Sequence, residues 1–149
     1  SVKCAKTIAW NLLSSHNKKK ILDQMNELSW GLHVHTPDAA TPKDGPSGGA
    51  AITIAILSFL INSPIKNDIA ITGEIDLNGN IKKIGGLTSK LLGAKKAGVK
   101  TVLIPQENLN DLDLIRKKEL SCEDNIFNII LVNTIYDIIK YVFTKNINL

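Results

Sequence analysis

The longest apolar stretch of the chain, residues 50–61, directly follows a segment crowded with proline and glycine. The stretch is interrupted by Thr53 and Ser58 and is too short to cross a bilayer, which takes about 20 apolar residues in a helix. Residues 36–46 before it hold three prolines, two aspartates and Gly45, so they must form a loop. The sequence therefore predicts a helix over 47–60 that begins abruptly after a loop.

Helical and strand patterns alternate along the rest of the chain. Apolar residues at helical spacing predict a first helix over 5–13, and a polar, lysine-rich break follows at 17–20. The Asn78-Gly79 pair predicts a tight hairpin. Further strands are expected at 32–35, 68–72, 101–104 and 126–132, and further helices at 87–97, 109–120 and 134–143. This order predicts a mixed α/β (α+β) fold, and no boundary divides residues 1–149 into two domains.

Composition argues against a nucleic-acid-binding protein and against a disulfide scaffold. The net charge is +4, but only one of the 18 basic residues, Arg116, is an arginine, and aromatic residues make up 5% of the chain. Arginine forks and stacking aromatics are what nucleic-acid recognition normally uses. The cysteines, Cys4 and Cys122, form no CxxC pair. Two isolated cysteines suit a reducing compartment and give no structural zinc site.

Ser47 lies in Gly45-Pro46-Ser47-Gly48-Gly49, which matches the G-x-S-x-G pattern of α/β-hydrolases. That fold needs a strand leading into the serine and a histidine after it, whereas here a loop precedes Ser47 and every histidine comes earlier. A serine at a helix start lies beside backbone N–H groups that have no helical partner and can stabilise an oxyanion. The two glycines after it would let a substrate backbone come close. The alternative is that Ser47 is only the helix N-cap.

Lys90 is the candidate general base. Without a histidine, a lysine can activate serine if it loses its proton, and burial favours the neutral form. On the expected helix over 87–97, Lys90 lies in an apolar stripe with Leu87 and Leu91, as well as Ala94 and Ala97, while Lys95 and Lys96 project away. The alternative is a lysine at the edge of the stripe whose ammonium group reaches solvent.

The segment 42–49, Pro-Lys-Asp-Gly-Pro-Ser-Gly-Gly, closely resembles the P-K-D-G-P-S-A-G signature of the Lon protease family. Other motifs follow the family's order over most of the chain from Leu32 onwards. They are the segments 32–35, 40–41, 72–74 and 84–87, Lys90, and the segments 94–105 and 107–108. The resemblance implies a Lon-type proteolytic domain with short sheets and flanking helices.

The resemblance implies an ATP-dependent serine endopeptidase with a Ser–Lys dyad, carried here by Ser47 and Lys90. Thr72 matches a threonine that helps to position the lysine, and Asp44 matches an acidic loop residue linked to opening and closing of the site. Gly48 replaces the family's alanine, which loosens the first helical turn, and Asp38-Ala39 replaces Glu-Gly.

Lon proteins join this domain to an ATPase module, which holds ATP and Mg²⁺, and assemble as homo-hexamers. From the resemblance we expect residues 1–149 to hold neither that module nor the first strands of the family's proteolytic domain. We expect an excised domain that itself needs no cofactor or metal. The implied substrates are unfolded or damaged proteins, in the service of protein quality control. The implied compartment is intracellular: the mitochondrial matrix in a eukaryote, the cytoplasm in a bacterium. No membrane or nucleic-acid partner is expected.

Other readings of the same residues remain open. His33 and His35 could join Asp38 or Asp44 in a triad with Ser47, but a polar strand face is the simpler interpretation, and no third metal ligand is evident. Residues 85–90 lack the spacing of a phosphate-binding loop. A catalytically silent Lon-like domain that serves as an assembly or interaction module is the main alternative function.

Overall fold

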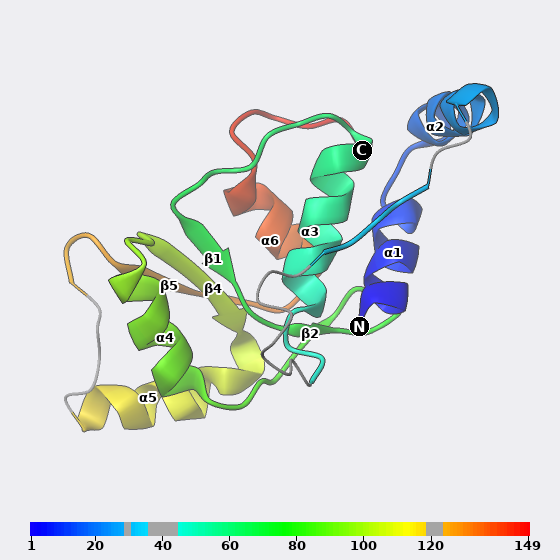
Figure 1. Cartoon of the computed structure of the whole chain (residues 1–149). Coiled ribbons are helices and arrows are strands. Elements are labelled where there is room, and N and C mark those ends of the chain that lie inside the picture. Colours follow the sequence, from blue (N-terminus) through cyan, green and yellow to red (C-terminus); the bar gives the residue numbers. More distant parts are fainter. Residues whose placement is uncertain (29–30, 36–44, 119–123) are drawn as a thin grey trace.

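The computed structural model describes residues 1–28, 31–35, 45–118 and 124–149 (Figure 1). The helices are α1 (Val2–Asn11), α2 (Ser15–Leu28), α3 (Gly49–Leu60), α4 (Leu87–Lys96), α5 (Leu109–Lys117) and α6 (Ile135–Val142), with a short 3-10 helix η1 (Gln106–Asn108). The strands are β1 (Ile69–Ile71), β2 (Glu74–Ile75), β3 (Ile81–Lys82), β4 (Thr101–Pro105) and β5 (Asn128–Val132). The mixed α/β class predicted from the sequence is confirmed.

A parallel sheet forms the centre of the fold, in the order β1-β4-β5. The register pairs Ile69 with Thr101 on one side of β4 and Thr101 with Asn128 on the other. Alternate residues of a strand point to opposite faces, and the middle strand has an apolar core on each. Leu103 belongs to the cluster that contains α1, α3 and α6, whereas Val102 and Ile104 belong to the cluster that contains α4 and α5. Figure 1 shows these two sets of helices on opposite sides of the sheet.

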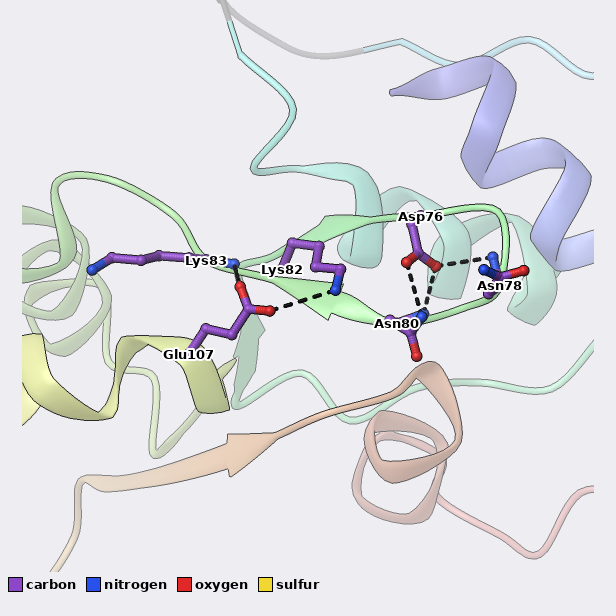
Figure 2. A network of polar contacts seen from close by, with 6 residues as sticks. All are labelled: Asp76, Asn78, Asn80, Lys82, Lys83 and Glu107. Atoms are coloured by element: carbon purple, nitrogen blue, oxygen red, sulfur yellow. Dashed lines mark hydrogen bonds and ion pairs between the residues drawn. The ribbon is translucent and has the colours of Figure 1, made fainter.

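The hairpin predicted around Asn78-Gly79 is present as the antiparallel pair β2–β3, in which Ile75 pairs with Ile81. Asp76 fixes its turn, because one carboxylate oxygen accepts the N–H groups of Asn78 and Asn80, each at 2.9 Å, and the other accepts the Asn80 side chain at 2.8 Å (Figure 2). These bonds lower the pKa of Asp76, and the Asn80 side chain contributes most. Gly79 has a φ of 83°, the left-handed conformation that glycine adopts without strain.

Two local predictions are wrong. The polar break at 17–20 lies inside α2. Its lysines are good helix formers, and Ser14 Oγ accepts the N–H of Asn17 at 3.3 Å at the start of that helix. The strand expected at 32–35 is also missing: residues 31–35 are described but form no strand. Leu32 and Val34 do pack against the first core cluster, while His33 and His35 are exposed. The alternation therefore reflects which side chains are buried, although the described segment 31–35 forms no strand.

Candidate active site

Ser47 lies in the turn that leads into α3 and is partly buried. The described residues before it, Gly45 and Pro46, form a bend, so the prediction that Ser47 follows a loop at a helix start is confirmed for this part of the chain. The N-cap of α3 is Gly48, with φ −87° and ψ −3° and no side-chain cap. The alternative interpretation of Ser47 as the N-cap is therefore wrong.

Backbone hydrogen bonds tie the Ser47 turn to the segment after β1. The Ser47 carbonyl accepts the Gly73 N–H at 2.8 Å, and the Ala50 N–H donates to the Gly73 carbonyl at 3.0 Å. The Thr72 hydroxyl lies 3.5 Å from the same Ser47 carbonyl, at the long limit of a hydrogen bond. Thr72 thus contacts the nucleophile's backbone, and its own N–H donates to Leu103 of β4 at 3.1 Å.

Two glycines allow this close approach. A Cβ on Gly73 would lie 2.5 Å from Ile81 Cγ2, and a Cβ on Gly49 would lie 3.0 Å from Ile75 Cγ2. Gly49 is buried by this packing, so its small size serves the fold, and the expectation that it admits a substrate backbone is wrong. Gly48 differs, because a Cβ there would meet only Ile52 Cδ1, at an ordinary 3.7 Å.

The amides around Ser47 fall into two groups. The N–H of Gly49 donates to the Pro46 carbonyl at 3.0 Å, and those of Ala50 and Ile52 also have backbone acceptors. For the Ser47 and Gly48 N–H groups, no acceptor is found among the described residues. They lie at the positive end of the helix dipole of α3 and are the amides that an oxyanion could engage.

Lys90 lies in the first turn of α4 and is partly buried. Gly86, the N-cap, has a φ of 66°, and its carbonyl accepts the Lys90 N–H at 3.2 Å. The predicted apolar stripe is present in part: Leu87 and Leu91 are buried, but Ala97 is exposed. The Lys90 side chain forms no hydrogen bond or ion pair within the described residues. Because it is also only partly buried, it occupies the edge of the stripe.

The segment between β3 and α4 is held by side chains that follow β4. Figure 2 shows Glu107 between Lys82 and Lys83: it accepts the Lys83 N–H at 2.8 Å and lies 3.5 Å from the Lys82 ammonium group. The Lys83 N–H is the largest cause of the lowered pKa of Glu107. Asp111 lies 3.0 Å from the Lys83 ammonium group, and hydrogen bonds from Lys83 and then Asn108 lower its pKa.

The other sequence-derived candidates have separate outcomes. Asp44 and Asp38 lie outside the described residues, so their predicted roles are untested. His33 and His35 are both exposed. In the part of the chain that the structure describes, no group of three histidine, cysteine, aspartate or glutamate side chains could hold a metal ion. Nor does any helix among those residues have both the length and the apolar character needed to span a membrane.

Residues 2–145 match the model of the Lon protease (S16) C-terminal proteolytic domain. The chain belongs to this family. The resemblance drawn from the 42–49 segment and the motifs after it is thereby confirmed at the level of the family.

Relatives from a virus and from bacteria agree with the Lon assignment. The Lon protease homolog of Acanthamoeba polyphaga mimivirus is 47% identical over 139 residues, which cover 93% of this chain and 13% of that protein. The Lon protease of Campylobacter jejuni is 46% identical over 128 residues, 83% of this chain and 16% of that protein. That of Buchnera aphidicola from Acyrthosiphon pisum is 58% identical over 86 residues, 58% of this chain and 11% of that protein. The chain therefore spans only a small part of these relatives.

Sequence reasoning gave no role to Asn108, which is fully buried beside the segment that leads to Lys90. Asn108 does lie in the family-like segment 107–108, but a local motif does not reveal which distant residue the side chain binds. That partner, Ile84, is 24 residues away in sequence.

Proposed function

We propose that the chain is a serine endopeptidase domain in which Ser47 is the nucleophile and Lys90 the general base. The observation that carries this proposal is the Ser47 turn: its carbonyl is anchored by Gly73, and the N–H groups of Ser47 and Gly48 have no acceptor among the described residues. Family membership supports a proteolytic role for that arrangement.

The proposed reaction is acyl transfer to serine. Neutral Lys90 accepts the proton of the Ser47 hydroxyl as Oγ attacks the peptide carbonyl, and the amides of Ser47 and Gly48 stabilise the oxyanion. The intermediate collapses, the C–N bond breaks, and Lys90 gives its proton to the leaving amine. Water then attacks the ester and gives a proton to Lys90. The acid product leaves as that proton returns to Ser47 Oγ.

Thr72 and Asp44 are proposed as supporting residues. The Thr72 N–H donates to Leu103 of β4, and its hydroxyl lies 3.5 Å from the Ser47 carbonyl, so these contacts suit a residue that supports the nucleophile. A role of Thr72 in positioning Lys90 rests on the resemblance alone. The role of Asp44 in opening or closing the site rests on the resemblance alone.

We further propose that residues 1–149 act as the proteolytic part of a larger ATP-dependent protease. ATP and Mg²⁺ would be held by an ATPase module, since residues 85–90 lack the spacing of a phosphate-binding loop. A homo-hexameric ring, unfolded or damaged proteins as substrates, a role in quality control, and a mitochondrial or bacterial cytoplasmic location belong to the same proposal.

Labelling of Ser47 tests the catalytic proposal. A peptide boronate or fluorophosphonate should react with Ser47. Ser47→Ala should abolish this labelling, and Lys90→Met should reduce its rate at least about 10³-fold. Ser89→Ala and Lys96→Met are matched controls on α4 with exposed side chains and should react like the unmodified chain. Equal labelling of Lys90→Met and Lys96→Met would refute the dyad.

A catalytically silent assembly module is the second candidate. Its supporting observation is that the Lys90 side chain is only partly buried and has no hydrogen-bond or ion-pair partner among the described residues. Absence of Ser47 labelling in a folded chain, judged by a cooperative thermal melt, would favour this alternative over the peptidase.

A further inference from the structure

Asn108 is a fully buried polar side chain, 0% exposed, at the end of η1. Its carboxamide oxygen accepts the Ile84 N–H at 3.0 Å, and its nitrogen donates to the Ile84 carbonyl at 2.9 Å and to Asp111 at 2.7 Å. The carboxamide thus forms with the Ile84 backbone the two hydrogen bonds that a neighbouring strand would otherwise form. No other side chain that the structure describes binds both backbone groups of one residue in this segment.

Ile84 lies between β3 and α4, the helix that carries Lys90. It is 5% exposed and packs into the second core cluster with Leu87 and Leu91. Gly85 and Gly86 separate it from the helix, and a Cβ at either position would meet nothing within 4 Å. The two glycines add no side-chain contacts of their own at this joint. The place at which the chain enters α4 is therefore set by Ile84 before the joint and by the buried Leu87 and Leu91 after it.

The neighbouring bonds cannot replace those of Asn108. Glu107 holds the Lys83 N–H, and Asp111 holds the Lys83 ammonium group, but both act on an exposed residue outside the core. Water can compete for exposed bonds of this kind, whereas a buried donor or acceptor that loses its partner bears the full cost of desolvation. Asn108 is therefore the group that fixes the backbone at Ile84.

We propose that Asn108 is a positioning residue for Lys90: by binding both backbone groups of Ile84 it sets the place from which α4 presents Lys90 to Ser47. This inference rests on the proposed function for its catalytic consequence. Its structural part, that Asn108 controls the surroundings of Lys90, can be measured without any reaction.

The rate of Ser47 labelling tests the catalytic part. Asn108→Ala should slow labelling per folded molecule by roughly 10- to 100-fold, the range expected when a reacting group is displaced by about 1 Å. The pH profile of labelling should also change, because the proposed base would act from a different position. Leu112→Ala is the matched control: Leu112 is 0% exposed in the same cluster but belongs to α5. It should lower the melting temperature without moving the pH profile.

Asn108→Asp separates hydrogen bonding from packing. The aspartate fills nearly the same volume and can still accept the Ile84 N–H, but when ionised it cannot donate to the Ile84 carbonyl or to Asp111. It should label as slowly as Asn108→Ala, and it serves as the test variant if Asn108→Ala does not fold. Labelling of a folded Asn108 variant at the control rate, with an unchanged pH profile, would overturn the inference.

NMR of lysine side chains labelled with ¹³C at Cε keeps the two proposals apart. The Lys90 signal is assigned by its loss in Lys90→Met. Substitution of Asn108 should change the chemical shift of this Lys90 signal, whereas Leu112→Ala should not. A response of Lys90 in a chain whose Ser47 never reacts would reject the peptidase and keep the positioning role. An unresponsive Lys90 in a chain whose Ser47 reacts would do the reverse.

Discussion

The two halves of the candidate site are held in place by different kinds of hydrogen bond. The turn that carries Ser47 is anchored through the backbone, with Gly73 donating to the Ser47 carbonyl at 2.8 Å and accepting from Ala50 at 3.0 Å. No ionisable side chain takes part in these bonds. Their geometry depends on the absence of a Cβ at Gly73, which would lie 2.5 Å from Ile81 Cγ2.

The segment that leads to Lys90 is anchored through side chains. Asn108 binds both backbone groups of Ile84, while Glu107 and Asp111 bind the backbone and the ammonium group of Lys83. Side-chain anchors can be removed by one substitution, and two of these carry charges that titrate. We therefore expect the nucleophile half to be sensitive to added volume, and the base half to be sensitive to lost hydrogen bonds and to acid.

The largest expected effect on stability comes from Asn108→Ala. Loss of the carboxamide leaves the buried N–H and carbonyl of Ile84 without partners, which should cost about 2–4 kcal/mol in the free energy of unfolding. Asn110→Ala is the matched control, because Asn110 is exposed on α5, and it should change stability by less than about 0.5 kcal/mol. Urea unfolding measures both. A cost for Asn108→Ala no larger than the control's would contradict the anchoring role.

Gly73→Ala should cost somewhat less, about 1–3 kcal/mol, because it adds one methyl group to a packed contact. The added Cβ meets the branched side chain of Ile81, which cannot swing away freely. Combining Gly73→Ala with Ile81→Ala removes the clash, so the double variant should lose less stability than the sum of the two single changes. Strict additivity in chemical unfolding would show that the close approach at Gly73 is not limiting.

Acid should loosen the base half before the nucleophile half. The pKa values of Glu107 and Asp111 are lowered from 4.5 and 3.8, so the folded state binds protons less readily than the unfolded state. Their contribution to the free energy of unfolding is fully present above the pKa values of the unfolded state. It is lost as the pH falls through the pKa values of the folded state. Glu107 is exposed and Asp111 is only partly buried, so the effect is small. As the pH falls through these folded-state pKa values, the hydrogen-exchange protection of the Lys83 amide should decrease relative to that of the Gly73 amide. Replacing Glu107 with Gln should remove much of the difference, and parallel loss at both amides would contradict it.

The smallest expected effect is a gain from Gly48→Ala, which introduces the residue that the family signature has at this position. Gly48 has helical dihedral angles and space for a methyl group against Ile52, so alanine should raise stability by about 0.4–1 kcal/mol through lower entropy of the unfolded chain. Gly93→Ala on α4, where a Cβ meets nothing, should give a similar gain. Thermal melts decide the sign. A loss at 48 beside a gain at 93 would mean that the Ser47 turn needs glycine.

Local signals allowed many of the elements to be predicted. The Asn78-Gly79 pair located the hairpin, and a predicted helix start at Thr134 was confirmed by a capping box with Asp137. Errors arose where the local signal was indirect. The lysines at 18–20 were interpreted as a break although they extend α2, and the alternation at 32–35 was interpreted as a strand although only its burial pattern holds.

The sequence by itself determined the family and the positions of Ser47, Thr72 and Lys90 within its motifs, because residue types at fixed spacing are visible without coordinates. Tertiary structure decided what surrounds them. The buried Gly49 and the carboxamide of Asn108 act on Ile75 and Ile84, which are 26 and 24 residues away along the chain. Such partners depend on how β1, the β2–β3 hairpin and β4 are brought together, and no local propensity or periodicity encodes that distance.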